Sequence, residues 1–193
     1  LDAPAILAGY SRLVIDCNRA PGSPGSIPAE SDGTAVPGNR DLGPADRAAR
    51  EAALFEPYQR AIADHLATVE TGGRVPVLLS IHSFTPVMAG RARPWQVGIL
   101  WNRDGRIARP LLAALAREPG LVVGDNEPYS AREPTGYTTR VHGEGAGRPH
   151  VLVELRQDEI DTVAGAGRHA DILARTLEQI LADPALYRRA EAP

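Results

Sequence analysis

Three short apolar segments, each followed directly by polar residues, constrain the fold of this 193-residue chain more than any other feature. They lie within residues 13–19, 77–83 and 151–158. Such runs are typical of strands buried on both faces of a sheet. Open parallel sheets bind ligands beyond the carboxyl ends of their strands, so neighbouring strands here would bring their polar ends into one cleft. The residues expected to line it are Asp16, Asn18, Arg19, His82, Glu154 and Arg156.

Apolar residues at helical spacing alternate with the strand-like segments. We expect helices over residues 46–69, 107–117 and 162–181, and Pro57 should kink or split the first of them. We expect strands over residues 5–8, 13–15, 75–81, 96–101, 121–123 and 150–155. Long loops are expected over residues 20–43 and 124–149, and loops of this length often close over ligands. The alternation predicts a three-layer α/β sandwich with a mostly parallel or mixed central sheet, as a single domain over residues 1–193.

Composition excludes several classes of function. The net charge of −3 gives no case for a nucleic-acid surface. No apolar stretch approaches the roughly 18–20 residues of a membrane span, so no membrane partner is expected. Cys17 is the only cysteine, which excludes an intrachain disulfide and makes the cytoplasm the expected location. No glycine-rich or Walker-A nucleotide motif follows a strand. The expected partner is a small molecule, with the oligomeric state left open.

His82 is the strongest candidate for a metal ligand or catalytic group, because it stands at the end of an apolar run rather than within it. A catalytic zinc takes three protein ligands and a water molecule. His65 and His169 lie in helical patterns and are expected to be solvated. The chain contains no H-E-x-x-H motif, so the sequence supplies one clear ligand and no complete site.

Glu154 interrupts an apolar strand, and a carboxylate in that position is costly unless it is paired or functional. It is therefore a candidate general base, with an ion pair to Arg156 as the structural alternative. Asn18 and Arg19 form a donor-rich pair suited to a substrate carboxylate, unless Arg19 merely packs the following loop. Asp16 is expected to position Arg19 or a loop backbone.

Two further residues have less defined roles. Cys17 has no histidine in a diagnostic local position, so we do not expect it to act as a nucleophile. His142 lies in the second long loop, which is rich in hydrogen-bond donors. A supporting role near the site, a direct role as donor and a plain surface position all remain open for it.

Five motifs in order carry a family resemblance. They occupy residues 11–19, 31–40, 80–86, 124–130 and 153–158. Together they resemble the N-formylglutamate amidohydrolase family, over essentially the whole chain. The resemblance implies an α/β sandwich related to zinc carboxypeptidases and aspartoacylase-like deacylases, with one catalytic zinc. It also implies hydrolysis of N-formyl-L-glutamate to glutamate and formate, at the end of one route of histidine degradation.

The resemblance also implies roles for individual residues. His82 resembles the metal-binding histidine of the family. Asn18 and Arg19 resemble its substrate-carboxylate pair, with Arg12 and Arg156 as helpers. Glu154 resembles the base that activates the zinc-bound water.

One part of the family pattern is absent from this sequence. Family members usually carry an earlier strand with a second metal-binding histidine and then a metal-binding carboxylate. We therefore expect these residues to be part of a longer protein. Two alternatives stay open: a related deacylase or carboxypeptidase that acts on another N-acyl amino acid or small peptide, and a metal-free binder of acidic amino-acid derivatives.

Overall fold

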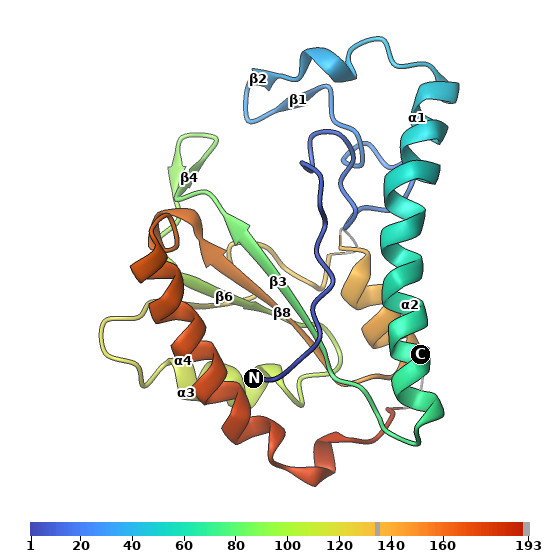
Figure 1. Ribbon diagram of the computed structural model, residues 1–193. Coiled ribbons are helices and arrows are strands. Elements are labelled where there is room, and N and C mark those ends of the chain that lie inside the picture. Colours follow the sequence, from blue (N-terminus) through green and yellow to red (C-terminus); the bar gives the residue numbers. More distant parts are fainter. Residues whose placement is uncertain (134–135, 191–193) are drawn as a thin grey trace. The chain divides into compact units, whose positions relative to one another are not determined.

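A computed structural model describes residues 1–133 and 136–190 of the chain (Figure 1). It divides into two units, each of which is described by itself. The sheet unit contains the described residues of 75–134 and 139–193 together with Leu1, and the helix unit contains those of 2–74 and 135–138. The expectation of a single domain over residues 1–193 stays a prediction.

A four-stranded mixed sheet forms the centre of the sheet unit, in the order β3-β8-β6-β7. Strand β3 (Leu78–Phe84) runs parallel to β8 (His150–Arg156). Strand β6 (Val97–Leu100) runs antiparallel to β8 and parallel to β7 (Val123–Asp125). The predicted α/β sandwich with a mixed central sheet is confirmed.

Helices α3 (Ala108–Leu115) and α4 (Val163–Leu181) pack on one face of this sheet (Figure 1). Helix α4 begins after Thr162, whose side chain accepts a hydrogen bond from the backbone N–H of Gly165. Alternate residues of each strand point into the core between sheet and helices. The buried core residues are Val97, Ile99, Ile107, Ala108, Leu111, Leu115, Val151, Val153, Leu155, Leu173 and Leu177. The opposite face of the sheet therefore carries the other set of side chains, which includes Glu154.

Short elements connect the main ones. In the sheet unit these are the antiparallel pair β4 (Val87–Met88) and β5 (Arg91–Ala92), the π-helical turn η3 (Thr139–Gly143), and the 3-10 turns η4 (Glu144–Ala146), η5 (Gln157–Glu159) and η6 (Pro184–Leu186). In the helix unit they are the antiparallel pair β1 (Glu30–Ser31) and β2 (Thr34–Ala35) and the 3-10 turn η1 (Pro37–Asn39). The two predicted long loops thus contain local structure, although residues 134 and 135 lie outside the described part.

A long helical segment dominates the helix unit and consists of α1 (Pro44–Arg50), the π-helical turn η2 (Glu51–Phe55) and α2 (Glu56–Thr71). The sequence predicted a kink or break at Pro57. Pro57 instead lies in the first turn of α2, directly after the π turn, and the chain continues through without a gap (Figure 1). Because proline lacks the N–H that an α-helix would use there, a wider turn before it is a common accommodation.

The strands predicted over residues 5–8 and 13–15 are wrong, because these described residues form no strand. Side chains replace the expected ladder of backbone hydrogen bonds. Asn39 donates to the carbonyl of Leu13 at 2.7 Å, and Arg50 donates to that of Val14 at 2.8 Å. The apolar run contributes to a small core instead, where Ile15, 2% exposed, packs with Ile27 and Phe55.

The remaining predicted elements are present with shifted ends. The strand expected over residues 75–81 runs from Leu78 to Phe84, beyond Pro76, which has no N–H to give to a sheet. The strand expected over residues 121–123 begins at Val123. Among the described helices, none has both the length and the apolar character needed to cross a membrane.

Candidate functional site

Three residues lie side by side across the middle of the sheet, on neighbouring strands. His82 of β3 is in register with Glu154 of β8, and Glu154 is in register with Gly98 of β6. Residues in register on neighbouring strands share a face, and this is the face opposite to the α3–α4 core. We call His82, Glu154 and Gly98 the polar row. The sequence therefore correctly placed His82 and Glu154 together.

Glu154 is buried, with 6% of its surface exposed. Its neighbours in β8, Val153 and Leu155, belong to the apolar core on the other face. Burying a carboxylate costs free energy. A protein keeps such a group either because specific contacts compensate this cost or because the group is needed for function. A buried carboxylate beside an imidazole is the kind of pair that exchanges protons in acid–base catalysis.

Gly98 provides the space that lets the loop after β7 approach this row. A Cβ atom built on Gly98 would lie 2.1 Å from the carbonyl oxygen of Glu127 and 3.3 Å from the Cβ of Glu154. The backbone of Glu127 therefore covers the glycine on the same face as Glu154. No side chain at position 98 would be compatible with this loop position.

His82 is half-buried, and its Nε2 atom lies 2.9 Å from the hydroxyl oxygen of Ser80. Ser80 precedes His82 by two residues, so both side chains are on the same face of β3. The hydroxyl group either donates to or accepts from the ring, according to the imidazole tautomer. Ser80 thereby restrains the orientation of the ring beside Glu154.

The loop after β7 is fixed by Asn126. Its backbone N–H donates to the carbonyl of Ile99 at 2.9 Å, and its side-chain oxygen accepts from the backbone N–H groups of Trp101 and Ala131. Asn126 has a φ of 55°, a left-handed conformation that asparagine tolerates better than most residues. A cis peptide bond joins Glu127 to Pro128. The loop predicted to close over a ligand therefore has a defined path above the polar row.

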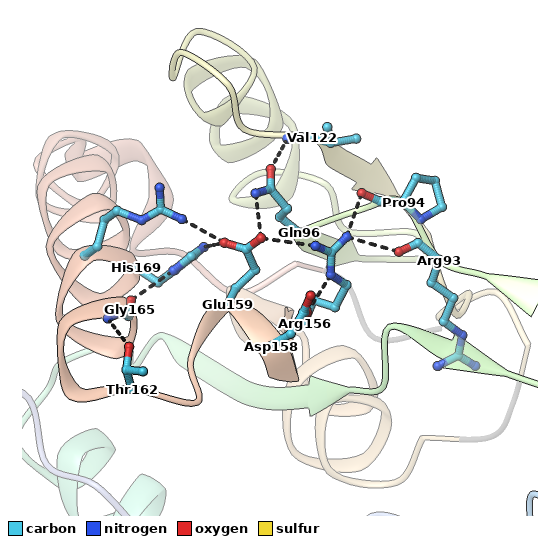
Figure 2. Close-up of polar contacts among 11 residues, drawn as sticks. Arg93, Pro94, Gln96, Val122, Arg156, Asp158, Glu159, Thr162, Gly165 and His169 are labelled. Atoms are coloured by element: carbon cyan, nitrogen blue, oxygen red, sulfur yellow. Dashed lines mark hydrogen bonds and ion pairs between the residues drawn. The ribbon is translucent and has the colours of Figure 1, made fainter.

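Arg156 is engaged in a network at the end of β8 (Figure 2). Its Nε atom donates to Asp158 at 2.7 Å, and its two terminal nitrogens donate to Glu159 and to the carbonyl oxygens of Arg93 and Pro94. All three guanidinium nitrogens of Arg156 are therefore engaged in hydrogen bonds to other residues of the chain. The substrate-binding role of Arg156 stays a prediction, and its contacts here are structural.

Glu159 is the centre of that network. Its carboxylate accepts hydrogen bonds from Gln96 at 2.7 Å, from Arg156 at 3.1 Å and from Arg168 at 2.7 Å. The expectation that His169 is solvated is wrong, since its side chain is only 1% exposed. The His169 ring lies between the carbonyl of Gly165 and Glu159, with its Nε2 atom 3.8 Å from the carboxylate (Figure 2). The His169 side chain therefore points from α4 into the protein interior, and its contacts there are structural.

The other predicted site residues belong to the helix unit. Asp16 accepts hydrogen bonds from the Arg12 guanidinium and from the backbone N–H of Asn18. The Asn18 side-chain oxygen accepts from the backbone N–H groups of Tyr137 and Thr138 at 3.0 and 2.9 Å. These contacts organise the turn that follows residues 13–15, which the sequence had suggested as a third strand of the sheet.

Arg19 lies against the loop that follows it, with its Nε atom 3.5 Å from the position of a Cβ atom built on Gly25. This agrees with the alternative in which Arg19 packs that loop. The substrate-binding roles of Asn18, Arg19 and Arg12 stay predictions, as does their convergence with the polar row.

The Cys17 thiol has a pKa above its ordinary value, because it is partly buried and lies near the Asp16 carboxylate. A raised pKa keeps the sulfur protonated at neutral pH. The thiolate is the nucleophilic form of cysteine, so this environment disfavours nucleophilic chemistry at Cys17, in line with the sequence analysis.

His142 makes stability depend on pH. Burial, and secondarily the Arg148 guanidinium, lower the pKa of this side chain below its ordinary value. Below about pH 6.5 the unfolded chain therefore binds a proton at His142 that the folded chain does not, and stability falls by up to about 1.4 kcal/mol per pH unit until the folded pKa is reached. We expect His142→Asn to lose less stability than the unsubstituted chain between pH 7 and pH 5.5, measured by urea unfolding. Parallel curves for the two proteins would contradict this.

The predicted zinc site is incomplete in the described part of the chain. Residues 1–133 and 136–190 contain no group of three or more His, Cys, Asp or Glu side chains placed to hold a metal ion. A catalytic zinc takes three protein ligands, so these residues do not fit one by themselves. The metal-binding role of His82 stays a prediction.

Arg93, Tyr129 and Gly98 were not singled out individually from the sequence. The Arg93 guanidinium stacks on the ring of Tyr129, 4.9 Å from its centre, and lies 5.9 Å from the centre of the Phe84 ring. Tyr129 was visible only as part of the motif at residues 124–130. No sequence pattern marked Arg93 as a site residue, because the aromatic residues that its side chain contacts are distant in sequence.

Comparison with known proteins identifies the family of this chain. The sequence model of the N-formylglutamate amidohydrolase family matches residues 1–160. The chain belongs to the N-formylglutamate amidohydrolase family. No curated protein matches the sequence of this family member.

The solved structures that resemble this N-formylglutamate amidohydrolase family member include the following two. A gene product of Agrobacterium tumefaciens is 38% identical, with a TM-score of 0.85, and the match covers 90% of this chain and 68% of that chain. The N-formylglutamate amidohydrolase of Ralstonia eutropha is 20% identical, with a TM-score of 0.63, and the match covers 89% of this chain and 73% of that chain. The second likeness concerns the fold alone.

Proposed function

We propose that the chain hydrolyses the amide bond of N-formyl-L-glutamate or a similar N-acyl amino acid. The observation that carries this proposal is the register of His82 with Glu154 on adjacent parallel strands, in a member of an amidohydrolase family. A buried carboxylate next to an imidazole suits a reaction in which water attacks a carbonyl carbon and a nitrogen leaves.

Glu154 is the general base in this proposal. Its carboxylate takes a proton from a water molecule as the water oxygen bonds to the formyl carbon. The carbon–nitrogen bond then breaks, and the same proton passes from Glu154 to the departing amine. The products are formate and the free amino acid, and Glu154 returns to its starting form.

The surroundings of Glu154 support this role. Its side chain is buried, and the backbone of Glu127 covers Gly98, which is in register with Glu154 on the same face. Ser80 restrains the His82 ring beside it.

A substrate panel tests the proposal. N-formyl-L-glutamate, N-acetyl-L-glutamate and N-acetyl-L-aspartate would be offered to the purified protein, and the released acid and amino acid quantified. We expect the highest kcat/KM with the formyl substrate. Preference for an acetyl substrate would indicate a related deacylase, and binding without hydrolysis of any of them would reject the proposed reaction.

A further inference from the structure

Arg93 lies just before β6, at the edge of the sheet where β3 and β8 end. Its backbone carbonyl accepts a hydrogen bond from Arg156, the last residue of β8. Its side chain points away from the Glu159 carboxylate (Figure 2). It extends instead to Phe84, the last residue of β3, and to Tyr129 in the loop after β7.

This position is on the polar-row side of the sheet. Phe84 follows His82 by two residues and therefore shares its face, about 7 Å further along the strand. Tyr129 belongs to the loop whose Glu127 carbonyl covers Gly98. The Arg93 guanidinium is thus attached to both of the segments that border His82 and Glu154.

Neutral groups hold the guanidinium in place. One terminal nitrogen donates to the Tyr129 hydroxyl at 3.0 Å, and the other is directed at the sulfur of Met88. The rings of Tyr129 and Phe84 add cation–π contacts. A guanidinium has five N–H donors, and these contacts orient the cation without supplying a negative charge.

The described partners of Arg93 differ from those of two other half-buried arginines of the sheet unit. Arg156 pairs with Asp158 and Glu159, and Arg106 pairs with Asp104. Among the described residues, no Asp or Glu lies within ion-pair distance of Arg93. A half-buried, oriented guanidinium without an acidic partner is suited to bind an anionic ligand, and its planar fork matches a carboxylate.

We propose that Arg93 is a specificity-determining residue that binds the side-chain carboxylate of an acidic N-acyl amino acid. The inference rests on the proposed function, because it takes the reacting amide to be at the polar row. N-formyl-L-glutamate carries such a carboxylate, whereas N-formyl-L-glutamine is nearly isosteric and neutral there. Arg93 would therefore favour the first ligand over the second.

Equilibrium binding measures this preference directly. Calorimetric titration with N-formyl-L-glutamate and N-formyl-L-glutamine would be done in the Glu154→Gln background, to suppress turnover. Arg93→Met should lower affinity for the glutamate derivative by about 10- to 100-fold, the loss of a charge-assisted hydrogen-bonded pair, and leave the glutamine derivative within about twofold. Arg91→Met is the matched control, since it removes an exposed charge from β5 nearby and should change neither affinity.

Two results would overturn the inference: an unchanged preference in Arg93→Met, or an equal loss of affinity for both ligands, which would indicate a purely structural role. If Arg93→Met does not fold, Arg93→Lys decides the question. Lysine retains the positive charge but not the planar fork of the guanidinium. The inference therefore requires that the preference for N-formyl-L-glutamate over N-formyl-L-glutamine still fall by about threefold or more.

Separate assays distinguish this failure from failure of the proposed function. Hydrolysis of N-formyl-L-glutamate with no role for Arg93 in the preference would overturn only the inference. Arg93-dependent binding by a protein that hydrolyses no substrate would overturn only the reaction. A protein that binds neither ligand would overturn both.

Discussion

Glu154→Gln is expected to lower kcat for N-formyl-L-glutamate by about 10²- to 10⁴-fold, the usual contribution of a general base. The amide has nearly the same size as the carboxylate and suits the same buried position in β8, but it cannot accept the proton of the attacking water. KM should change much less than kcat, because the substitution removes a group needed in the transition state. Formate release over time measures the effect.

The matched control for this substitution is Asp171→Asn, which makes the same chemical change at an exposed position of α4. Helix α4 packs on the face of the sheet opposite to Glu154, so this variant should keep full activity. Thermal unfolding of both variants shows whether a loss of activity comes from the missing carboxylate or from a destabilised fold. If kcat of Glu154→Gln stayed within about twofold of kcat of the unsubstituted protein, Glu154 would not be the general base.

Gly98→Ala is expected to destabilise the fold by about 2–3 kcal/mol, toward the upper end of the usual cost of overpacking. The new methyl group would lie 2.1 Å from the carbonyl oxygen of Glu127. A clash with backbone cannot be relieved by a rotamer change, so the loop after β7 must move. Urea unfolding measures the change in free energy, and activity should fall with it because the same loop borders Glu154.

Gly167→Ala provides a control with the opposite expected sign. Gly167 lies within α4, and a Cβ atom built there meets nothing within 4 Å. Alanine is favoured over glycine inside a helix by about 1 kcal/mol, so this variant should be more stable than the unsubstituted protein. Equal stability of Gly98→Ala and the unsubstituted protein would mean that the loop does not lie against β6 in solution.

Much of the sheet unit was predictable because its strands and helices have strong periodic patterns. The apolar run that ends at Leu155 and the amphipathic pattern of α4 each marked an element within about one residue of its observed ends. Strand direction was less accessible. A strand buried on both faces shows the same apolar run in either direction, so the apolar pattern does not reveal that β6 runs antiparallel to β8.

The errors arose where tertiary contacts outweighed local pattern. Ile15 looked like part of a strand, but its apolar side chain packs in the core of the helix unit while Asn39 and Arg50 bind the adjacent backbone carbonyls. His169 was expected on the surface, yet it faces Glu159 from the inner side of α4. Such partners are distant in sequence, and no local spacing reveals them.

The same reason explains why part of the site was found and part was not. His82 and Glu154 each interrupt or end an apolar run, so their chemistry was visible at once. Arg93 depends on Tyr129, 36 residues away, for its orientation. Only the folded chain makes it a candidate for substrate recognition.

The π-helical turn between α1 and α2 holds one residue more than an α-helical turn in its place would need. An extra residue in an uninterrupted α-helix would rotate everything before it by about 100°. The wider turn advances by a smaller angle per residue, so α1 keeps nearly the face that it would have without the extra residue, and Arg50 points toward Val14 and Asn39, which it binds. A single-residue deletion within Glu51–Phe55 should therefore leave these contacts in place, whereas a deletion within α1 or α2 would turn Arg50 away from them.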